Sequence, residues 1–395
     1  MRICFICHSS RLGGAERVFL EMIDALKSAG NDCFVILPSR GELCAELLAL
    51  AVPFSIISFP LWTSSTRPSW FQQIKTGIGL VSNSVLVAWA IHKWKADIVV
   101  SNTVTVGVGA MGSRLANRSH VWHLQEFGGE DHGLFFVFGE ALSLRLAGAL
   151  SSCCLCLSEA LAAKYKRFIP ASKIAVVHPS MHRAFRSTEN NESVGSLLPP
   201  RNGRFRCVIV GTLAEGKGQE DSILAFDLLS KAGISAELFI VGSGVPFYKR
   251  HLEELIVRKR LEGRVLLTGE VRTALPVMQA SDIVLVCSRS EGFGRVTIEG
   301  MMAGKPVIGA RAGATAELIA DGVNGLLYTH GDPKDLADKI EYLYKNPEVA
   351  EQLGKNAQSW VDGFFTPERY SREILALLNS SLNPSVVVAA SAPTA

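Results

Sequence analysis

Short apolar runs alternate with longer amphipathic stretches along most of the chain, and the runs have the length of buried strands. In the first part we predict strands at Ile3–Ile6, Cys33–Leu37, Ile98–Ser101, Val121–Leu124, Cys153–Leu157 and Ile174–Val177. In the second part we predict strands at Arg206–Val210, Glu237–Val241, Val265–Thr268, Ile283–Cys287, Pro306–Ile308 and Gly325–Tyr328. Because helical segments such as Ala15–Ala29 separate these strands, the pattern predicts an α/β fold with parallel sheets covered by helices on both faces.

The alternation stops once, in a polar, non-periodic stretch that contains Pro199 and Pro200. The predicted divisions are a first domain at 1–185, a linker at 186–204, a second domain at 205–365, a helix at 366–382 and a disordered tail at 383–395. In open α/β sheets, ligands bind outside the carboxyl ends of the strands. Two such domains facing each other would therefore place a ligand in an interdomain cleft.

Composition narrows the class of protein. The 395 residues are 48% apolar and 19% charged, which excludes a mostly disordered chain. Forty Lys+Arg against 37 Asp+Glu leave a net charge of +3, too little for a dedicated nucleic-acid binder. The nine cysteines show no regular spacing, so we expect reduced thiols and a cytoplasmic protein. Cys4 and Cys7 lie on opposite faces of a strand and are not expected to share a metal ion.

The chain starts directly with a strand and offers no cleavable signal peptide, and we expect no transmembrane segment. The apolar stretch Thr76–His92 is too short for a span of about 20 residues, so a buried helix is the favoured interpretation. A helix lying at a membrane interface is the alternative. Residues 1–180 hold 16 Lys+Arg and 12 Asp+Glu. With the exposed-looking Trp62, Trp70 and Phe71, this charge hints at a lipid-linked acceptor or contact with the inner membrane leaflet.

Three glycine-containing loops each follow a predicted strand and precede a helix. The first contains Gly13-Gly14, the second runs from Gly211 to Lys217-Gly218, and the third is Glu291-Gly292-Phe293-Gly294. Glycines before a helix N-terminus let backbone N–H groups approach an anion closely, and a lysine beside them adds a cation. By themselves, the first two loops are also compatible with a plain tight turn and a surface lysine.

The third loop carries a carboxylate at Glu291 and a second at Glu299, about one turn into a helix that starts near Val296. Carboxylates are common at helix N-termini for electrostatic reasons alone. Around exposed Gly-Phe-Gly amides, however, they can also accept hydrogen bonds from a polyol while the amides bind phosphate. A nucleotide-diphosphate sugar requires both kinds of contact.

Taken together, Glu291-x7-Glu299, the Gly211…Lys217-Gly218 loop, the early Gly13-Gly14 and the late Gly304-x-Pro306-Val307 resemble the retaining glycosyltransferases of family 4. The resemblance extends from residue 1 to about residue 380 and is strongest over 207–330. It implies a GT-B fold, in which two Rossmann-like domains face an interdomain cleft and a C-terminal helix returns towards the first domain.

The resemblance also implies site residues. The catalytic ones would be His123 near the transferred sugar, Lys217 at the diphosphate leaving group and Glu291 at the hydroxyls of the donor sugar. Glu299 would bind the ribose hydroxyls, and Val271 lies where the family's backbone usually meets the base. The implied donor-binding residues are Gly13, Gly14, Gly211, Lys217, Val271, Glu291, Gly292, Phe293, Gly294, Arg295, Val296 and Glu299.

One position departs from the family. Many members carry an arginine directly after the glycine that closes the first strand of the second domain, where this chain has Thr212. Arg289 and Arg295 are the candidate substitutes, and donor affinity is the property in question. His8, close to the first glycine loop, is a second-rank candidate for the active-site histidine.

The implied function is a retaining hexosyltransferase. It would move a sugar from a UDP-, GDP- or ADP-sugar to the hydroxyl of a glycan or lipid-linked acceptor, in polysaccharide, glycolipid or glycoconjugate biosynthesis. The sequence contains no D-x-D and no His/Cys cluster with metal-ligand spacing, so we expect transfer without a metal or other cofactor. The expected location is the cytoplasm or the inner face of the membrane. The alternatives are a non-catalytic nucleotide-sugar-binding partner protein and a GT-B sugar-nucleotide epimerase.

Overall fold

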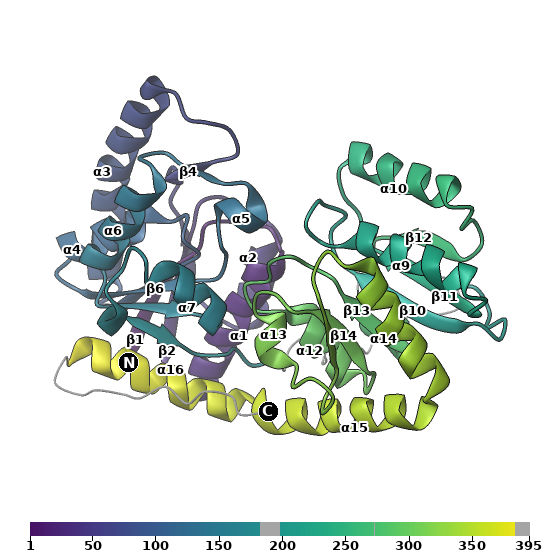
Figure 1. The fold of residues 1–395 in the computed structure, drawn as a ribbon. Helices are drawn as coiled ribbons and strands as arrows, with labels where there is room; N and C mark the ends of the chain where they lie inside the picture. The colour runs from purple at the N-terminus through teal and green to yellow at the C-terminus, as the bar shows by residue number, and fades with distance from the viewer. Residues whose placement is uncertain (182–197, 272, 384–395) are drawn as a thin grey trace. The chain divides into compact units, whose positions relative to one another are not determined.

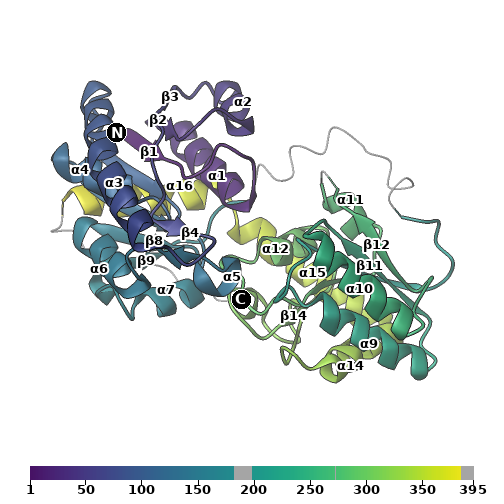
Figure 2. The ribbon, with the colours of Figure 1, turned by 90° about the horizontal axis from the view of Figure 1, so that it is seen from above.

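The computed structural model describes residues 1–181, 198–271 and 273–383. The chain forms two compact units, which we call unit 1 and unit 2 (Figures 1 and 2). Among the described residues, unit 1 comprises 1–181 with 365–383, and unit 2 comprises 198–271 with 273–364. Most of the predicted linker at 186–204 and nearly all of the tail at 383–395 lie outside the described residues.

Unit 1 is built on a seven-stranded parallel sheet with the order β3-β2-β1-β5-β6-β8-β9. Its strands are β1 (Arg2–Ile6), β2 (Asp32–Leu37), β3 (Phe54–Ile56), β5 (Ile98–Asn102), β6 (Ser119–Leu124), β8 (Cys153–Cys156) and β9 (Ile174–Val176). A separate antiparallel pair joins β4 (Thr63–Ser64) and β7 (Phe135–Phe136). The six strands predicted for this part are confirmed, whereas β3, β4 and β7 are too short to produce a periodic signal.

Helices cover both faces of this sheet (Figure 1). They are α1 (Gly14–Ser28), α2 (Glu42–Ala49), α3 (Trp70–Lys93), α4 (Gly107–Leu115), α5 (Gly129–His132), α6 (Glu140–Leu150), α7 (Glu159–Tyr165) and α16 (Pro367–Leu382). The C-terminal α16 packs on α1, and its Tyr370 and Ile374 share a hydrophobic core with Phe5 and Phe19. On the other face, α3 packs against α4.

Unit 2 contains a six-stranded parallel sheet with the order β12-β11-β10-β13-β14-β15. Its strands are β10 (Phe205–Val210), β11 (Ala236–Val241), β12 (Val265–Gly269), β13 (Ile283–Val286), β14 (Val307–Ala310) and β15 (Leu326–Tyr328). Its helices are α9 (Gln219–Lys231), α10 (Pro246–Arg258), α11 (Leu275–Gln279), α12 (Arg295–Met302), α13 (Thr315–Leu318), α14 (Pro333–Lys345) and α15 (Pro347–Phe364). All six predicted strands are confirmed, and β10 lies next to β13 at the centre of the sheet.

The structure corrects two expectations about unit 1. Trp62 is buried, not exposed: its ring stacks on Trp122 at 5.1 Å and its Nε1 donates to the carbonyl of Val104. The favoured interpretation of Thr76–His92 as a buried helix holds for one side of α3 only, because Leu80 and Val87 are buried whereas Val81 and Val85 are exposed. By length and mean hydropathy, α3 is the one helix among the described residues that could cross a membrane.

The nine cysteines are free thiols, and Cys4 and Cys7 are fully buried. Burial raises the pKa of both thiols, that of Cys7 to about 12, because the buried thiolate loses its hydration. Both residues are therefore neutral core groups at physiological pH.

Candidate active site

In unit 2, the loops after two adjacent strands bring a cation and a carboxylate together. Lys217 follows β10 and Glu291 follows β13, and the Lys217 ammonium donates to Oε1 of Glu291 at 2.7 Å. The backbone ties the same loops together, since the Arg289 N–H donates to the Gly216 carbonyl at 2.7 Å. Both side chains of the ion pair remain partly exposed, so a ligand can compete for them.

Two glycines fix the starts of the helices beside this pair. Gly218 precedes α9 with φ +74°, and a Cβ there would lie 2.2 Å from the carbonyl oxygen of Cys287. Gly294 precedes α12 with φ +82°, and a Cβ there would lie 2.8 Å from the side chain of Leu318. Only glycine combines this left-handed backbone with so close an approach. The N-termini of α9 and α12 thus lie beside Lys217 and Glu291, and helix N-termini carry N–H groups without intrahelical partners, as an anion site requires.

Within α12, Arg295 and Glu299 form a second ion pair. The Arg295 Nη2 and Nε donate to the same oxygen, Glu299 Oε1, at 2.8 and 3.2 Å. Oε2 of Glu299 makes no hydrogen bond with any described residue. Glu299 therefore keeps one acceptor oxygen for a ligand hydroxyl, whereas the Arg295 guanidinium is already engaged.

The remaining predicted donor residues of unit 2 lie near the carboxyl ends of the strands. Phe293 is buried, so the Gly-Phe-Gly stretch can offer backbone groups but no ring to a ligand. Gly211 directly follows β10, and Val271, two residues beyond β12, is half-buried. Thr212 is exposed, and its carbonyl accepts a hydrogen bond from the Gln219 side chain at 3.0 Å.

In unit 1, the first glycine loop begins α1 through an internal cap. Gly13 is the N-cap residue, and its N–H donates to Oε2 of Glu16 at 3.0 Å. The other oxygen of Glu16 lies 3.1 Å from Nε2 of His8. The Gly13 N–H thus has its hydrogen-bond partner within the loop. At Gly14 the space is open, since a Cβ there would meet no atom within 4 Å. His8 orients the capping carboxylate in this arrangement.

His123 lies at the carboxyl end of β6, and a chain of polar side chains connects it to the adjacent β5 and, beyond it, to the end of β1. The Gln125 Nε2 contacts His123 Nδ1 at 3.2 Å and also donates to Oδ1 of Asn102, whose Nδ2 donates to Cys7 Sγ. Burial lowers the pKa of His123 to about 3, so the imidazole is neutral.

A neutral imidazole has one donor and one acceptor nitrogen. Because Gln125 donates to Nδ1 of His123, the proton resides on Nε2. The Nε2 atom is buried and has no hydrogen-bond partner among the described residues. A buried N–H without a partner is costly, and a ligand oxygen would satisfy it.

Glu126 is a buried carboxyl group that sequence reasoning missed. Its two oxygens accept from the N–H groups of Val104 at 2.9 Å and Gln125 at 3.2 Å, so it joins the loops after β5 and β6. Loss of hydration raises its pKa to about 8, although both N–H groups favour the carboxylate. The only sequence feature that points to Glu126 is its position directly after Val121–Gln125. That position does not reveal that the carboxyl group is buried.

One group of side chains has the composition of a metal site. Cys7, His8 and Glu16 place their ligand-type atoms within 4.8 Å of one another. Glu16 already binds Gly13 and contacts His8, and the Cys7 thiol stays protonated at neutral pH. These contacts indicate that the three side chains support the first glycine loop.

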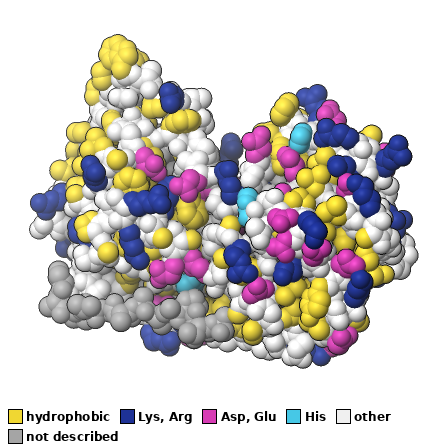
Figure 3. Space-filling view, in the orientation of Figure 1, with side chains coloured by type: hydrophobic (Ala, Val, Ile, Leu, Met, Phe, Trp, Pro, Cys, Tyr) yellow, Lys and Arg dark blue, Asp and Glu magenta, His cyan; other side chains and the backbone are white. Residues whose placement is uncertain are grey.

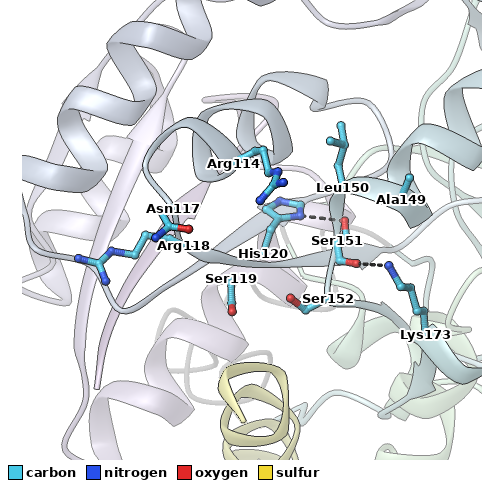
Figure 4. Close-up of a pocket in the computed structure, with 10 residues that line it drawn as sticks. All are labelled: Arg114, Asn117, Arg118, Ser119, His120, Ala149, Leu150, Ser151, Ser152 and Lys173. Atoms are coloured by element: carbon cyan, nitrogen blue, oxygen red, sulfur yellow. Dashed lines mark hydrogen bonds between the residues drawn. The ribbon is translucent and has the colours of Figure 1, made fainter. Parts of the chain in front are cut away.

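A polar pocket of about 430 Å³ lies at the opposite, amino edge of the unit 1 sheet (Figure 4). His120 at its floor is held by Ser151 at 2.9 Å and Ser101 at 2.8 Å, and Lys173 donates to the Ser151 carbonyl at 2.9 Å. None of the predicted site residues lines this pocket.

Each unit is thus an α/β domain with a parallel sheet, and polar loops lie at the carboxyl ends of its central strands. Two such domains in one chain define a protein of the GT-B class. Residues 198–360 match the family described as glycosyl transferases group 1, and residues 13–180 match a glycosyl transferase 4-like domain. Together these matches cover most of the chain, which therefore belongs to the glycosyltransferases.

Sequence relatives align over part of their length. An uncharacterised glycosyltransferase of Methanocaldococcus jannaschii is 37% identical over 126 residues, which are 32% of this chain and 35% of that protein. The N-acetyl-alpha-D-glucosaminyl L-malate synthase of Bacillus anthracis is 33% identical over 136 residues, which are 34% of this chain and 35% of that protein. The aligned part thus spans about a third of the length of either relative.

Similarity in structure extends over nearly the whole chain. Anabaena HepE, solved in complex with UDP, has a TM-score of 0.77 and 24% identity, covering 96% of this chain and 100% of that one. The same protein has also been solved in complex with UDP-glucose. At this identity, the likeness shows the GT-B fold.

Proposed function

We propose that the chain transfers a sugar from a nucleotide-diphosphate sugar to an acceptor hydroxyl, with retention at the anomeric carbon and without a metal ion. The observation that carries this proposal is the contact between Lys217 and Glu291 at the starts of α9 and α12. It places a cation, a carboxylate and two helix N-termini in one unit, and a diphosphate attached to a polyol needs this set of groups.

Unit 2 binds the donor in this proposal. Lys217 and the N–H groups at the starts of α9 and α12 stabilise the diphosphate, while Glu291 accepts hydrogen bonds from hydroxyls of the donor sugar. Glu299 accepts from the ribose hydroxyls with its open Oε2. Because HepE binds UDP and UDP-glucose, a UDP-sugar is the first donor to test, ahead of GDP- and ADP-sugars.

Arg289 is the better substitute for the cation that Thr212 does not provide. A Cβ at Gly216 would lie 4.0 Å from both Nε and Nη2 of Arg289, so this guanidinium lies beside the loop that carries Lys217. Arg295 lies within α12, where it forms an ion pair with Glu299. Because Arg289 lies beside the loop that carries Lys217 and an arginine fork suits phosphate oxygens, it is the substitute that we favour.

Unit 1 binds the acceptor, a glycan or a lipid-linked sugar. His123 takes part as a neutral hydrogen-bond donor through Nε2. It does not take part as a general base, because its second nitrogen already accepts from Gln125. Glu126 and Gln125 are positioning residues that hold the loops around His123.

In the transfer step, the bond between the anomeric carbon and the leaving phosphate oxygen breaks, and the acceptor oxygen bonds to the same face of that carbon. The proton of the acceptor hydroxyl goes to the departing phosphate oxygen, so the products are the glycoside and the nucleoside diphosphate. Negative charge develops on the leaving diphosphate, where Lys217 stabilises it. Such preorganised charge is the usual main source of rate enhancement.

The test is a panel of UDP-, GDP- and ADP-sugars, with binding, donor hydrolysis and transfer measured with and without EDTA. Binding of one donor with EDTA-insensitive turnover supports the proposal, whereas failure to bind any of them overturns it. Binding without turnover would favour a non-catalytic partner protein. A changed sugar nucleotide without an acceptor adduct would favour an epimerase.

A further inference from the structure

The outward side of α3 is apolar over its whole length. The exposed large side chains on it, which we call the apolar face of α3, are Trp70, Phe71, Ile74, Ile78, Val81, Val85, Leu86 and Trp89. More than half of each side chain is solvent-exposed. Their spacing of three and four residues places most of them in one stripe on a helix about 36 Å long. Figure 3 shows hydrophobic side chains at the projecting N-terminal end of α3, and soluble monomers rarely expose so extended an apolar surface.

The opposite side of α3 holds the helix in unit 1. Leu80, Val87 and Ile91 are buried there, and α4 approaches closely because Gly112 has no side chain. A Cβ at Gly112 would lie 2.7 Å from Cγ1 of Val87. At its C-terminal end, α3 leads within a few residues into β5 of the sheet. The helix is thus fixed with its apolar face outward, and crossing a bilayer would break this packing.

The charge around α3 is positive. Between Glu46 and Glu126 the chain contains a single acidic residue, Asp97, which accepts from the backbone N–H of Arg2 at 2.7 Å. The same stretch contains six basic residues, which are Arg67, Lys75, Lys93, Lys95, Arg114 and Arg118. Among the described residues, Glu140 lies beside Arg67 in the pocket at the first turn of α3, so the cations are in excess but not alone. A surface that combines apolar side chains with an excess of cations is complementary to anionic lipid.

One of these cations lies against the apolar face of α3, and two others belong to the neighbouring α4 and the loop after it. The Lys93 ammonium lies over the ring of Trp89, 4.8 Å from its centroid. Arg114 belongs to the last turn of the neighbouring α4, and Arg118 follows that helix; Figure 4 shows both at the edge of the polar pocket. Neither arginine forms a salt bridge with a described residue, so both charges are available to headgroup phosphates.

A second copy of the chain fits this surface less well than lipid does. In a two-fold contact the same face meets itself, so Lys75 and Lys93 would be brought against a surface that carries the same cations. Since α3 contains no acidic residue, nothing on the helix would neutralise these charges. Anionic headgroups supply the missing negative charge, and the interfacial zone of a bilayer accommodates exposed tryptophans such as Trp70 and Trp89.

We propose that unit 1 docks on an anionic lipid bilayer through the apolar face of α3, with this helix lying in the membrane interface. A pocket of about 410 Å³, lined by Arg67, Gln73, Phe135 and Glu140 among others, lies beside the first turn of α3 and would be carried to the lipid surface. The inference concerns a surface of unit 1 and does not depend on the donor chemistry proposed for unit 2.

The test is flotation of the full chain with vesicles of phosphatidylcholine alone and with vesicles that contain an equal part of phosphatidylglycerol. We expect the wild type to float with the anionic vesicles and to be released in part by high salt. The double variant V81E/V85E should lower the floating fraction by about tenfold, because it puts two charges into the apolar face of α3. The double variant K75A/K93A should weaken binding to the anionic vesicles only.

A matched control is V257E/V323E, which adds the same charges at two valines of unit 2 that are exposed to a similar extent. It should float like the wild type. Wild-type protein that stays in the soluble fraction with both kinds of vesicle overturns the inference, as does equal flotation of V81E/V85E. A wild-type dimer in sedimentation velocity that V81E/V85E dissociates, without any flotation, assigns the surface to a second copy. Binding of the UDP-sugar without vesicles, measured in parallel, tests the proposed function separately.

Discussion

The Lys217 ammonium lies 2.7 Å from Oε1 of Glu291, although 74 positions separate the two residues in the sequence. If Lys217 stabilises the departing diphosphate, its removal should affect turnover more than donor binding. We expect K217A to lower the rate of transfer by about 10²–10³-fold. Steady-state kinetics with the best donor of the panel measures this change.

K217R should fall between the wild type and K217A, because it keeps the charge but changes the geometry at phosphate. K231A is the matched control, since Lys231 forms an ion pair with Asp227 in the same unit. A K217A variant as active as K231A would remove Lys217 from the reaction.

Glu299 is expected to act in donor binding. E299A loses the acceptor of the ribose hydroxyls, so the dissociation constant of the donor should rise by about tenfold or more, as loss of a hydrogen bond to a charged group predicts. Isothermal titration with the free nucleotide measures the effect. In E341A, which breaks a comparable ion pair between Glu341 and Lys345, affinity should not change. Equal affinities of E299A and the wild type would exclude the ribose role.

Gly218 should tolerate no side chain. G218A places a Cβ 2.2 Å from the Cys287 carbonyl in a left-handed conformation, so the Lys217 loop must move. G233A has a similar φ of +76° but no atom within 4 Å, and it should cost only about 1 kcal/mol of folding free energy. We expect a larger fall in Tm for G218A, together with weaker donor binding. Equal Tm shifts in the two variants would show that the close approach is unimportant.

His123 should not titrate in the physiological range. Burial lowers its pKa from 6.5 to about 3, so the imidazole stays neutral until the solution is strongly acidic. H123A should therefore reduce turnover without shifting the pH profile of kcat between about pH 5 and 8. H92A, at an exposed histidine of α3, is the control and should retain full turnover. A profile that loses an ionisation near 6.5 in H123A would contradict a neutral donor.

Glu126 should make stability depend on pH. Its folded-state pKa is raised from 4.5 to about 8, so the folded chain holds a proton that the unfolded chain has lost between these values. The free energy of unfolding should then fall as pH rises through this window, by up to about 1.4 kcal/mol per pH unit. E126Q, which cannot ionise, should flatten this dependence in thermal unfolding.

E159Q, at an exposed glutamate of unit 1, is the control for E126Q. The pH dependence of unfolding of E159Q should remain that of the wild type. If E126Q has the same dependence as E159Q, the Glu126 carboxyl is ionised in the folded chain across the window.

Much of the fold follows from local patterns. Runs such as Ile3–Ile6 and Ile283–Cys287 are apolar throughout, and this indicates parallel strands buried on both faces. The start of α12 was also predictable to within one residue, because Gly294 precedes it and a glycine is favoured where the backbone is left-handed. The spacing of Glu291 and Glu299 also predicted that the two residues lie near each other, because only one loop and one helical turn separate them.

Other features depend on contacts between distant segments. The pattern of Trp70–Lys93 is apolar on both sides, so hydropathy cannot decide which side is covered; α4 covers one side because Gly112 allows close approach. Trp62 is buried because Trp122 stacks on it.

The sequence by itself determined two parallel α/β units, the glycines at the helix starts and the candidate charged residues, because strands, turns and helix caps depend on neighbouring residues. The tertiary structure decided which charges meet. It paired Lys217 with Glu291 through the adjacency of β10 and β13, left Nε2 of His123 without a partner among the described residues, and turned the apolar face of α3 outward. Pairing, desolvation and exposure are set by segments far apart in the chain, and no local pattern encodes them.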